Sequence, residues 1–570
     1  EALRLGCEAF ASDLNPVACL ILKVILEDIP RHGPGLGEQL RHTGAIIKDQ
    51  AERELADLYP PDSDGSKPIA YLWARTVRCE APNCGAEIPL MRSFWLCKKP
   101  NRRRALKPKT VALNGNRSAI EFDIFEPGTE AEVHAGTVSR ARATCMCCGS
   151  VLQPERVRAQ LSAQRGGADT VFDEHGHRIS GAKLLAVVTL QPGVQGRNYR
   201  LAKKGDYDAV LAAQERVKTI LIDWERGGKQ EPCPIPNEAT PVGGGSGAGR
   251  AFSIQKYGML KWSDLFTARQ KVALVALVRF TREAACKLDL DDAQLEPLVL
   301  ALSRAVNAGC SLARWHTSGE KHEGVMSRQA LPIVWDFSEG CPLSDATGGY
   351  HGAIDWVSTV ACSLPPLGPG QVQSEDAAAH PLPDDTSCVW FTDPPYYDAV
   401  PYADLSDFFL VWIKRVLPEH QLLRDQFEPT NPLSPKTREA VQDETKLDEG
   451  QAKNRAWFEM TMAKAFAEGR RVLREDGVGA VVFAHKTTEG WEALLSGLIR
   501  GGWTITGSWP IATEMGSRLR ARDSAALATS VHLICRPRPE DAPVGDWGDV
   551  LRELPSRVGD WMERLQGEGI

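Results

Sequence analysis

The segment Cys388-Val-Trp-Phe-Thr-Asp-Pro-Pro-Tyr-Tyr397 decides which fold we expect. Its first five residues form the short apolar run of a buried strand, and Asp393 follows directly at the carboxyl end of that strand. In open α/β sheets, ligands bind beyond the carboxyl ends of the strands. Two consecutive prolines stiffen the turn and remove two N–H donors, while their carbonyl groups remain as acceptors. The segment therefore predicts a binding loop at one edge of an α/β sheet.

The residue types of this loop suit the binding of an amine. The Asp393 carboxylate and the Pro394 carbonyl can accept both hydrogens of an exocyclic amino group, which directs its lone pair at an electrophile. The ring of Tyr396 can stack on a base that has left the duplex, an interaction worth about 1–3 kcal/mol. We therefore predict that Asp393, Pro394, Pro395 and Tyr396 are catalytic. The alternative is a Pro-rich turn followed by two core tyrosines.

The pattern around this loop alternates between strand and helix. The apolar run Val478 to Ala484 is typical of a buried parallel strand. Along the chain, we expect one helix before this strand and one after it. Two further strands, 503–509 and 530–536, follow each other without a helical pattern between them, so they can pair antiparallel. This alternation predicts a largely parallel α/β sheet. Two helices are also expected within 263–315.

Composition excludes several classes of protein. The chain has 570 residues, 43% hydrophobic and 25% charged, as in a globular protein and unlike a disordered or collagen-like one. At roughly 100–200 residues per domain, we expect three or four structural units. No apolar run approaches the roughly 18 residues of a membrane span. The net charge of −7 means that any nucleic-acid-binding face must be local. The 15 cysteines and the lack of a signal segment predict a reducing, cytoplasmic location.

Two cysteine pairs form a metal-binding pattern. Cys79 and Cys84 precede Gly85, and Cys145 and Cys148 precede Gly149, as in the two knuckle turns of a zinc ribbon. Four thiolates with no open position predict a structural zinc site. The neighbouring Cys147 could replace one of these ligands.

A basic stretch lies between the two cysteine pairs. It runs from Arg92 to Lys109 without an acidic residue and includes two aromatic residues. Such clusters neutralise phosphate groups, so we predict nucleic-acid binding, the alternative being a solvated basic surface. The predicted contacts are Lys98, Lys99, Arg102, Arg103 and Arg104.

The loop Asp393-Pro-Pro-Tyr396 resembles motif IV of the amino-methylating DNA methyltransferases, and its Asp form is typical of adenine methylases. This resemblance implies a Rossmann-like sheet with a terminal antiparallel strand, and S-adenosylmethionine as cofactor. The segment Ala11 to Ala18 is similar to the family segment in which an acidic residue ends the second strand. The resemblance thus implies that Asp13, with Asn15 and Asp393, contacts the cofactor. The alternative for Asp13 is a helix N-cap.

The chain resembles, more narrowly, a prokaryotic family of zinc-ribbon-containing, adenine-specific DNA methylases that is often encoded beside phage-defence genes. Similar segments are 92–97, 328–336, 400–407 and 482–486. The family has a Gly-rich cofactor loop after its first strand, and no Phe-x-Gly-x-Gly string occurs in these 570 residues. We therefore expect the sheet to lack its first strand, and segments to be missing at both ends.

These observations give one expected organisation. The fold class is α/β, with a methyltransferase sheet that is incomplete at its N-terminus, an inserted zinc ribbon and a helical insert. The expected domains are 1–45, the cofactor-acid part of the methyltransferase domain; 71–165, the zinc ribbon with the basic stretch; 166–250, an irregular insert or linker; 251–384, a helical insert for target recognition; 385–540, the methyltransferase domain with the Asp-Pro-Pro-Tyr motif; and 541–570, a C-terminal helix.

The expected function is methylation of the 6-amino group of adenine in double-stranded DNA, in restriction-modification or antiviral defence. One alternative is a catalytically incomplete DNA-binding subunit that acts with other subunits of a defence complex. Another is an amino-methyltransferase that acts on RNA or protein. His485, Lys486, Glu514 and Arg518 follow predicted strands and are expected near the cleft, without an assigned role.

Overall fold

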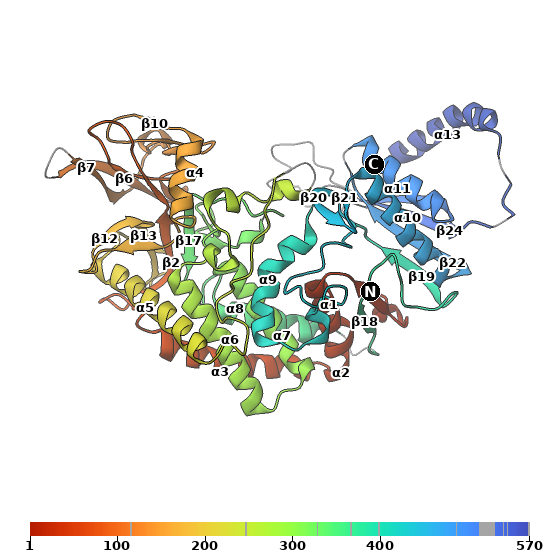
Figure 1. Ribbon diagram of the computed structural model, residues 1–570, viewed down its shortest axis with the longest axis horizontal. Helices are drawn as coiled ribbons and strands as arrows, with labels where there is room; N and C mark the ends of the chain where they lie inside the picture. The colour runs from red at the N-terminus through yellow and green to blue at the C-terminus, as the bar shows by residue number, and fades with distance from the viewer. Residues whose placement is uncertain are drawn as a thin grey trace. The chain divides into compact units, whose positions relative to one another are not determined.

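The computed structural model describes residues 1–113, 117–244, 248–327, 329–364, 368–396, 400–485, 487–511, 530–539, 541–543 and 545–567. The fold is mixed α/β with several small sheets, which confirms the α/β class (Figure 1). The chain forms two compact units. The first contains Glu1–Ala377 and Tyr397–Phe458, and the second contains Ala378–Tyr396 and Glu459–Ile570.

The main sheet of the first unit has four antiparallel strands in the order β14-β13-β2-β17. Its central strands, β2 (Lys67–Ala74) and β13 (Lys183–Leu190), are almost continuously apolar and are buried on both faces. Its edge strands are β14 (Asn198–Arg200) and β17 (Asp336–Gly340). One face packs on helices through residues such as Tyr71, and the other packs on a second sheet through residues such as Leu72.

Long amphipathic helices form the larger core of this unit. They are α3 (Gly35–Leu55), α5 (Lys204–Arg226), α6 (Ala268–Leu288), α7 (Asp292–Ala308), α8 (Tyr350–Ser363) and α9 (Tyr402–Val416). Thr267 and Asp291 cap α6 and α7, because their side chains accept hydrogen bonds from backbone N–H groups of the first turn. Gly44 lets α3 approach α8 closely, since a Cβ atom there would lie 2.6 Å from Ile354. The two helices predicted within 263–315 are confirmed.

The range 166–250 differs from the irregular insert that we expected. It contributes the hairpin β11 (Thr170–Phe172) and β12 (Arg178–Gly181), the central strand β13 and the 23-residue helix α5. The apolar run from Leu184 to Val188 is buried in the sheet, so this part of the sequence belongs to the core. The range 251–384 likewise supplies strands as well as helices, β17 and β18 (Gln371–Ser374) among them.

The N-terminal segment forms a strand-turn-helix unit. β1 (Phe10–Asp13) pairs in parallel with β18, and α1 (Pro16–Lys23) and α2 (Ile29–His32) follow, joined by one π-helical turn. The predicted strand ending at Asp13 is confirmed. Two hairpins also belong to the first unit: β15 (Arg314–His316) with β16 (Lys321–Glu323), and β20 (Asp443–Asp448) with β21 (Gln451–Lys453).

The cysteine-containing region consists of small antiparallel sheets. The cysteines lie between β3 (Thr76–Arg78) and β4 (Glu87–Pro89), and in a three-stranded sheet of β8 (Val138–Ser139), β9 (Arg142–Thr144) and β10 (Val151–Leu152). Helix α4 (Pro154–Ala163) packs beside them. Most of the basic stretch lies in a separate sheet of β5 (Trp95–Lys99), β6 (Arg102–Leu113) and β7 (Arg117–Phe125).

The second unit is built on one sheet in the order β19-β22-β24-β23. β19 (Ser387–Thr392) and β22 (Leu473–Phe483) are parallel, whereas β24 (Ser530–Pro537) is antiparallel to β22 and to β23 (Trp503–Ile511). Most of α10 (Arg455–Val472) belongs to this unit, with α11 (Thr488–Arg500) and α13 (Trp547–Gly567). The parallel pair, the antiparallel pair and the C-terminal helix are as predicted.

Across the described ranges, no helix has both the length and the apolar character that crossing a bilayer requires. All 15 cysteines are free thiols.

Candidate functional site

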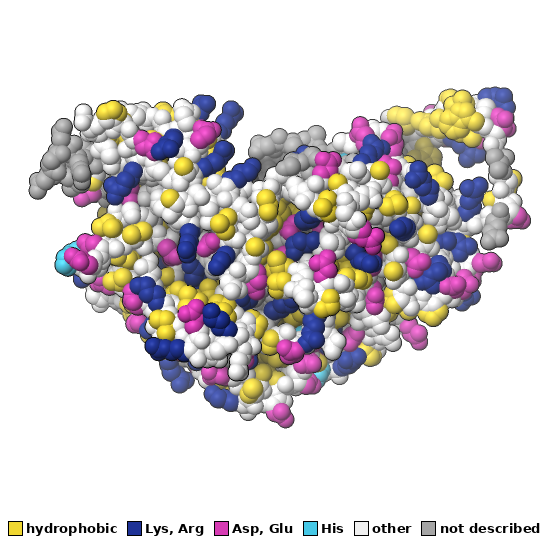
Figure 2. Space-filling view, in the orientation of Figure 1, with side chains coloured by type: hydrophobic (Ala, Val, Ile, Leu, Met, Phe, Trp, Pro, Cys, Tyr) yellow, Lys and Arg dark blue, Asp and Glu magenta, His cyan; other side chains and the backbone are white. Residues whose placement is uncertain are grey.

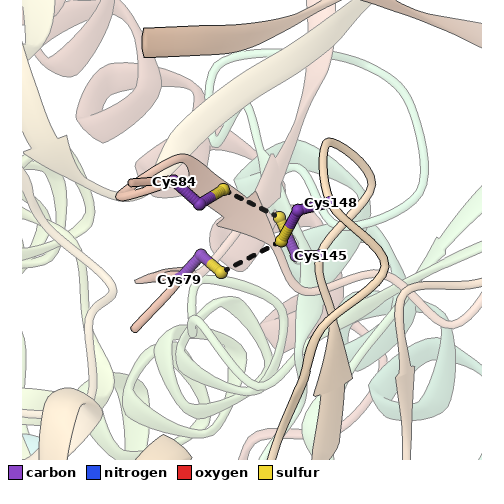
Figure 3. Close-up of side chains that lie close together, drawn as sticks. All are labelled: Cys79, Cys84, Cys145 and Cys148. Carbon is purple, nitrogen blue, oxygen red and sulfur yellow. Dashed lines mark hydrogen bonds between the residues drawn. The ribbon is translucent and has the colours of Figure 1, made fainter. Parts of the chain in front are cut away.

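The four predicted zinc ligands lie together at the tips of two hairpins. Cys79 and Cys84 lie in the turn between β3 and β4, and Cys145 and Cys148 lie in the turn between β9 and β10 (Figure 3). The backbone N–H of Cys79 donates to the Ala86 carbonyl at 2.8 Å, which closes the first turn. The N–H of Cys145 closes the second in the same way on the carbonyl of residue 150. Local backbone structure thus aims all four side chains at one point.

The spacing of the four sulfur atoms fits a tetrahedral metal ion. The Sγ atoms of Cys79 and Cys148 are 3.6 Å apart, those of Cys84 and Cys145 are 3.7 Å apart, and all four lie within 4.8 Å of one another. A tetrahedral zinc ion with Zn–S bonds of about 2.3 Å requires sulfur atoms about 3.8 Å apart. The cluster is therefore compatible with zinc.

The structure also resolves the ambiguity over Cys147. Its side chain is half-buried against apolar residues and is not part of the sulfur cluster. Burial raises the pKa of the Cys147 thiol to about 11, whereas hydrogen bonds from Ser150 lower the pKa of the exposed Cys148 thiol to about 6. The position of its sulfur atom within the cluster makes Cys148, and not Cys147, the fourth candidate ligand. The following Gly149 has φ +76°, a conformation that favours glycine.

The Asp-Pro-Pro-Tyr segment begins where β19 ends. Trp390 fixes one face of this strand, because its ring stacks on that of Trp503 at 5.3 Å between centroids. Asp393 is the first residue after the strand and its side chain is exposed, while Pro394 is buried. Desolvation by the nearby protein raises the pKa of the Asp393 carboxyl, and a hydrogen bond with Tyr396 opposes this shift. The Asp393 carboxylate therefore stands at the carboxyl end of a parallel strand.

An aromatic cluster supports this loop. The Tyr396 ring meets Phe483 edge-on at 5.6 Å, and Phe483 in turn stacks on the His485 ring at 6.1 Å and contacts Trp491 at 5.1 Å. The Trp491 indole N–H donates to the His485 carbonyl at 3.1 Å. His485 thus lies beside the loop, as expected, although Lys486, Glu514 and Arg518 lie outside the described residues. Phe483 and Trp491 were not predicted as site residues; the sequence signal for Phe483 was its place near the end of the apolar run 478–484.

Asp13 and Asn15 form the turn between β1 and α1 in the first unit. The Asn15 side chain caps α1 by accepting a hydrogen bond from the Val17 N–H at 3.0 Å. Asp13 accepts the Asn15 N–H at 2.8 Å, and its carboxylate is exposed at the carboxyl end of β1. The N-cap is therefore Asn15, and not Asp13 as the alternative reading held.

Acidic residues from other parts of the sequence neutralise most of the basic stretch. Four of the five predicted contact residues lie within 4.0 Å of a carboxylate oxygen, and the fifth, Arg103, donates to the carbonyl of Gly128. The ion pairs are Lys98–Glu130, Lys99–Glu320, Arg102–Glu320 and Arg104–Glu126. The stretch is thus less positive in space than in sequence.

In comparisons with protein-family models, curated proteins and solved structures, none matched this chain.

Proposed function

We propose that the protein transfers a methyl group from S-adenosylmethionine to the 6-amino group of adenine in double-stranded DNA. The observation that carries this proposal is the position of Asp393-Pro-Pro-Tyr396, directly beyond the carboxyl end of a parallel strand and against an aromatic cluster. The second unit supports it further, since its parallel pair followed by an antiparallel pair fits part of a Rossmann-like methyltransferase sheet.

The chain's own residues would act mainly by positioning. The Asp393 carboxylate and the Pro394 carbonyl accept the two amine hydrogens, which leaves the nitrogen lone pair directed outward. Pro395 keeps the loop rigid, and Tyr396 stacks on the flipped adenine. Held in this way, the amine nitrogen would present its lone pair to the methyl donor and would release a proton to water once methylated.

S-Adenosylmethionine, when bound, supplies the electrophilic methyl group. Asp13 fits the ribose end of this cofactor, because its exposed carboxylate lies at the carboxyl end of β1 and offers acceptors for hydroxyl groups. The side-chain oxygen of Asn15 already caps α1, so only its amide nitrogen is left for a cofactor contact. The four-cysteine cluster would hold zinc in a purely structural role. We place the enzyme in the cytoplasm, in restriction-modification or antiviral defence, acting alone or with other subunits.

A methyl-transfer assay tests this proposal. The full-length gene product, an Asp393→Ala variant and a control Asp476→Ala variant are incubated with unmodified duplex DNA and labelled S-adenosylmethionine. Asp476 suits the control because it lies in the same unit, exposed, and pairs only with its neighbour Arg474 among the described residues. We expect transfer by the wild type and the control and at least a 100-fold loss in Asp393→Ala.

The outcomes separate the alternatives. Transfer to RNA or protein in place of DNA would support the other amino-methyltransferase class. DNA binding without any transfer would support a non-catalytic DNA-binding subunit.

A further inference from the structure

The small sheet β8-β9-β10 of the zinc-ribbon region has two chemically different faces. Its inward residues Val138, Ala143 and Leu152 are buried in the apolar cluster that also contains Cys79 and Cys145. Strand alternation puts a second set of residues on the opposite face, where all of them are exposed. We call this set, together with the hairpin turn, the ribbon outer face: Ser139, Arg140, Arg142, Thr144 and Val151.

The ribbon outer face carries two arginines that form no ion pair with an acidic residue of the described ranges. Among the described residues, no carboxylate lies within 4.0 Å of the guanidinium group of Arg140 or Arg142. The surrounding sequence from 133 to 154 contains no Asp or Glu. Figure 2 shows Lys and Arg side chains, with Asp and Glu side chains among them, over the part of the molecule that carries α4 and β10. This face therefore differs from the basic stretch on β5 and β6, where most of the charged side chains lie within 4.0 Å of a carboxylate.

The turn between β8 and β9 has an unusual conformation for its sequence. Ser139 pairs with Arg142, so Arg140 and Ala141 are the two turn residues, with φ +48° and φ +63°. Hairpin turns with two positive φ values favour Asn-Gly, because residues with a Cβ atom are strained there. An arginine at this tip thus costs stability. Such strain is commonly retained where the side chain has a function.

We propose that the ribbon outer face binds the phosphate backbone of DNA through Arg140 and Arg142, with the Ser139 and Thr144 hydroxyl groups as further donors. This inference rests on the proposed function, which makes duplex DNA the ligand. Guanidinium groups bind phosphate oxygens through paired hydrogen bonds, and such contacts position the protein without reading sequence. The Cys145–Cys148 knuckle directly follows β9, so a metal ion there would fix the strand that carries Arg142.

A charge-matched pair of variants tests the proposal in the full chain. The first carries Arg140→Gln and Arg142→Gln, and the control carries Lys204→Gln and Arg216→Gln on α5, whose side chains pair with acidic residues. Binding to a fluorescent 30-base-pair duplex is measured by anisotropy over a range of salt concentrations. We expect the first variant to bind at least tenfold more weakly. Its plot of log affinity against log salt should lose about 1.8 units of slope, since each phosphate contact contributes about 0.9.

The control variant should lose less than threefold in affinity, and both variants should keep the wild-type melting temperature and zinc content. Equal losses in the two variants, or no duplex binding by the wild type, would overturn the proposal. Preferential binding to RNA would overturn DNA as the ligand. Methyl transfer is measured on the same samples. If the arginine variant transfers methyl groups with an unchanged KM for DNA, this inference is refuted and the proposed function stands. If DNA binding depends on the two arginines but no protein transfers methyl groups, the proposed function is refuted and this inference stands.

Discussion

Replacing Cys148 with serine removes one ligand from the sulfur cluster without disturbing the core. The Cys148 side chain is exposed, yet its Sγ lies 3.6 Å from that of Cys79. Structural zinc binding by four such ligands is worth about 10–16 kcal/mol, hence about 2.5–4 kcal/mol for each ligand. We therefore expect zinc affinity to fall roughly 100- to 1,000-fold.

The neighbouring Cys147 provides the matched control. Cys147→Ser changes the same atoms one residue earlier, outside the sulfur cluster. Zinc content after dialysis against a competing chelator, measured by mass spectrometry, should be near one ion for the wild type and Cys147→Ser, and well below one for Cys148→Ser. Zinc loss in Cys147→Ser with retention in Cys148→Ser would refute the assignment of ligands. Absence of zinc from all three would refute the metal site itself.

Two further predictions concern buried charges in the first unit. Glu339→Gln should lower the free energy of unfolding, measured by chemical denaturation, by about 3–5 kcal/mol, because it leaves the fully buried Arg269 without its counter-ion at 2.8 Å. As a control, Glu54→Gln breaks an exposed ion pair with Arg279 on the same helix, α6, and should lower it by about 0–1 kcal/mol. Equal losses in the two variants would contradict the importance of the buried pair. Burial beside Glu296 raises the pKa of Asp28 to about 7, so the folded state binds more protons than the unfolded state between about pH 4 and 7 and loses stability as the pH rises. Asp28→Asn should flatten that dependence of unfolding free energy on pH, and an unchanged slope would exclude Asp28 as its origin.

Local sequence signals predicted the elements that depend on neighbouring residues. The apolar run before Asp393 predicted β19, and the two Cys-Gly pairs predicted knuckle turns whose geometry depends on a few adjacent backbone groups. The clean alternation of strand and helix after residue 453 predicted the second unit. Each single strand, helix or turn among these is indicated by fewer than about 20 neighbouring residues, so tertiary contacts have little to override.

Features that depend on distant residues escaped prediction. The basic stretch has no acidic neighbour in sequence, but Glu320 lies more than 200 residues away and pairs with two of its cations. The polar composition of 166–250 concealed β13, in which six of the eight residues are buried in a sheet with β2, a strand far earlier in the chain. The ribbon outer face was missed for the opposite reason, since two isolated arginines are unremarkable until the sheet places them on one exposed face.

The central claim is that this protein makes 6-methyladenine, and the nucleosides of DNA test it most directly. Plasmid DNA from cells without other adenine methylases, expressing the full-length wild type or Asp393→Ala, is digested and analysed by mass spectrometry. The account predicts 6-methyladenine with the wild type and none above background with Asp393→Ala. Equal amounts of 6-methyladenine with both proteins, or none with either while both are folded and soluble, would contradict it.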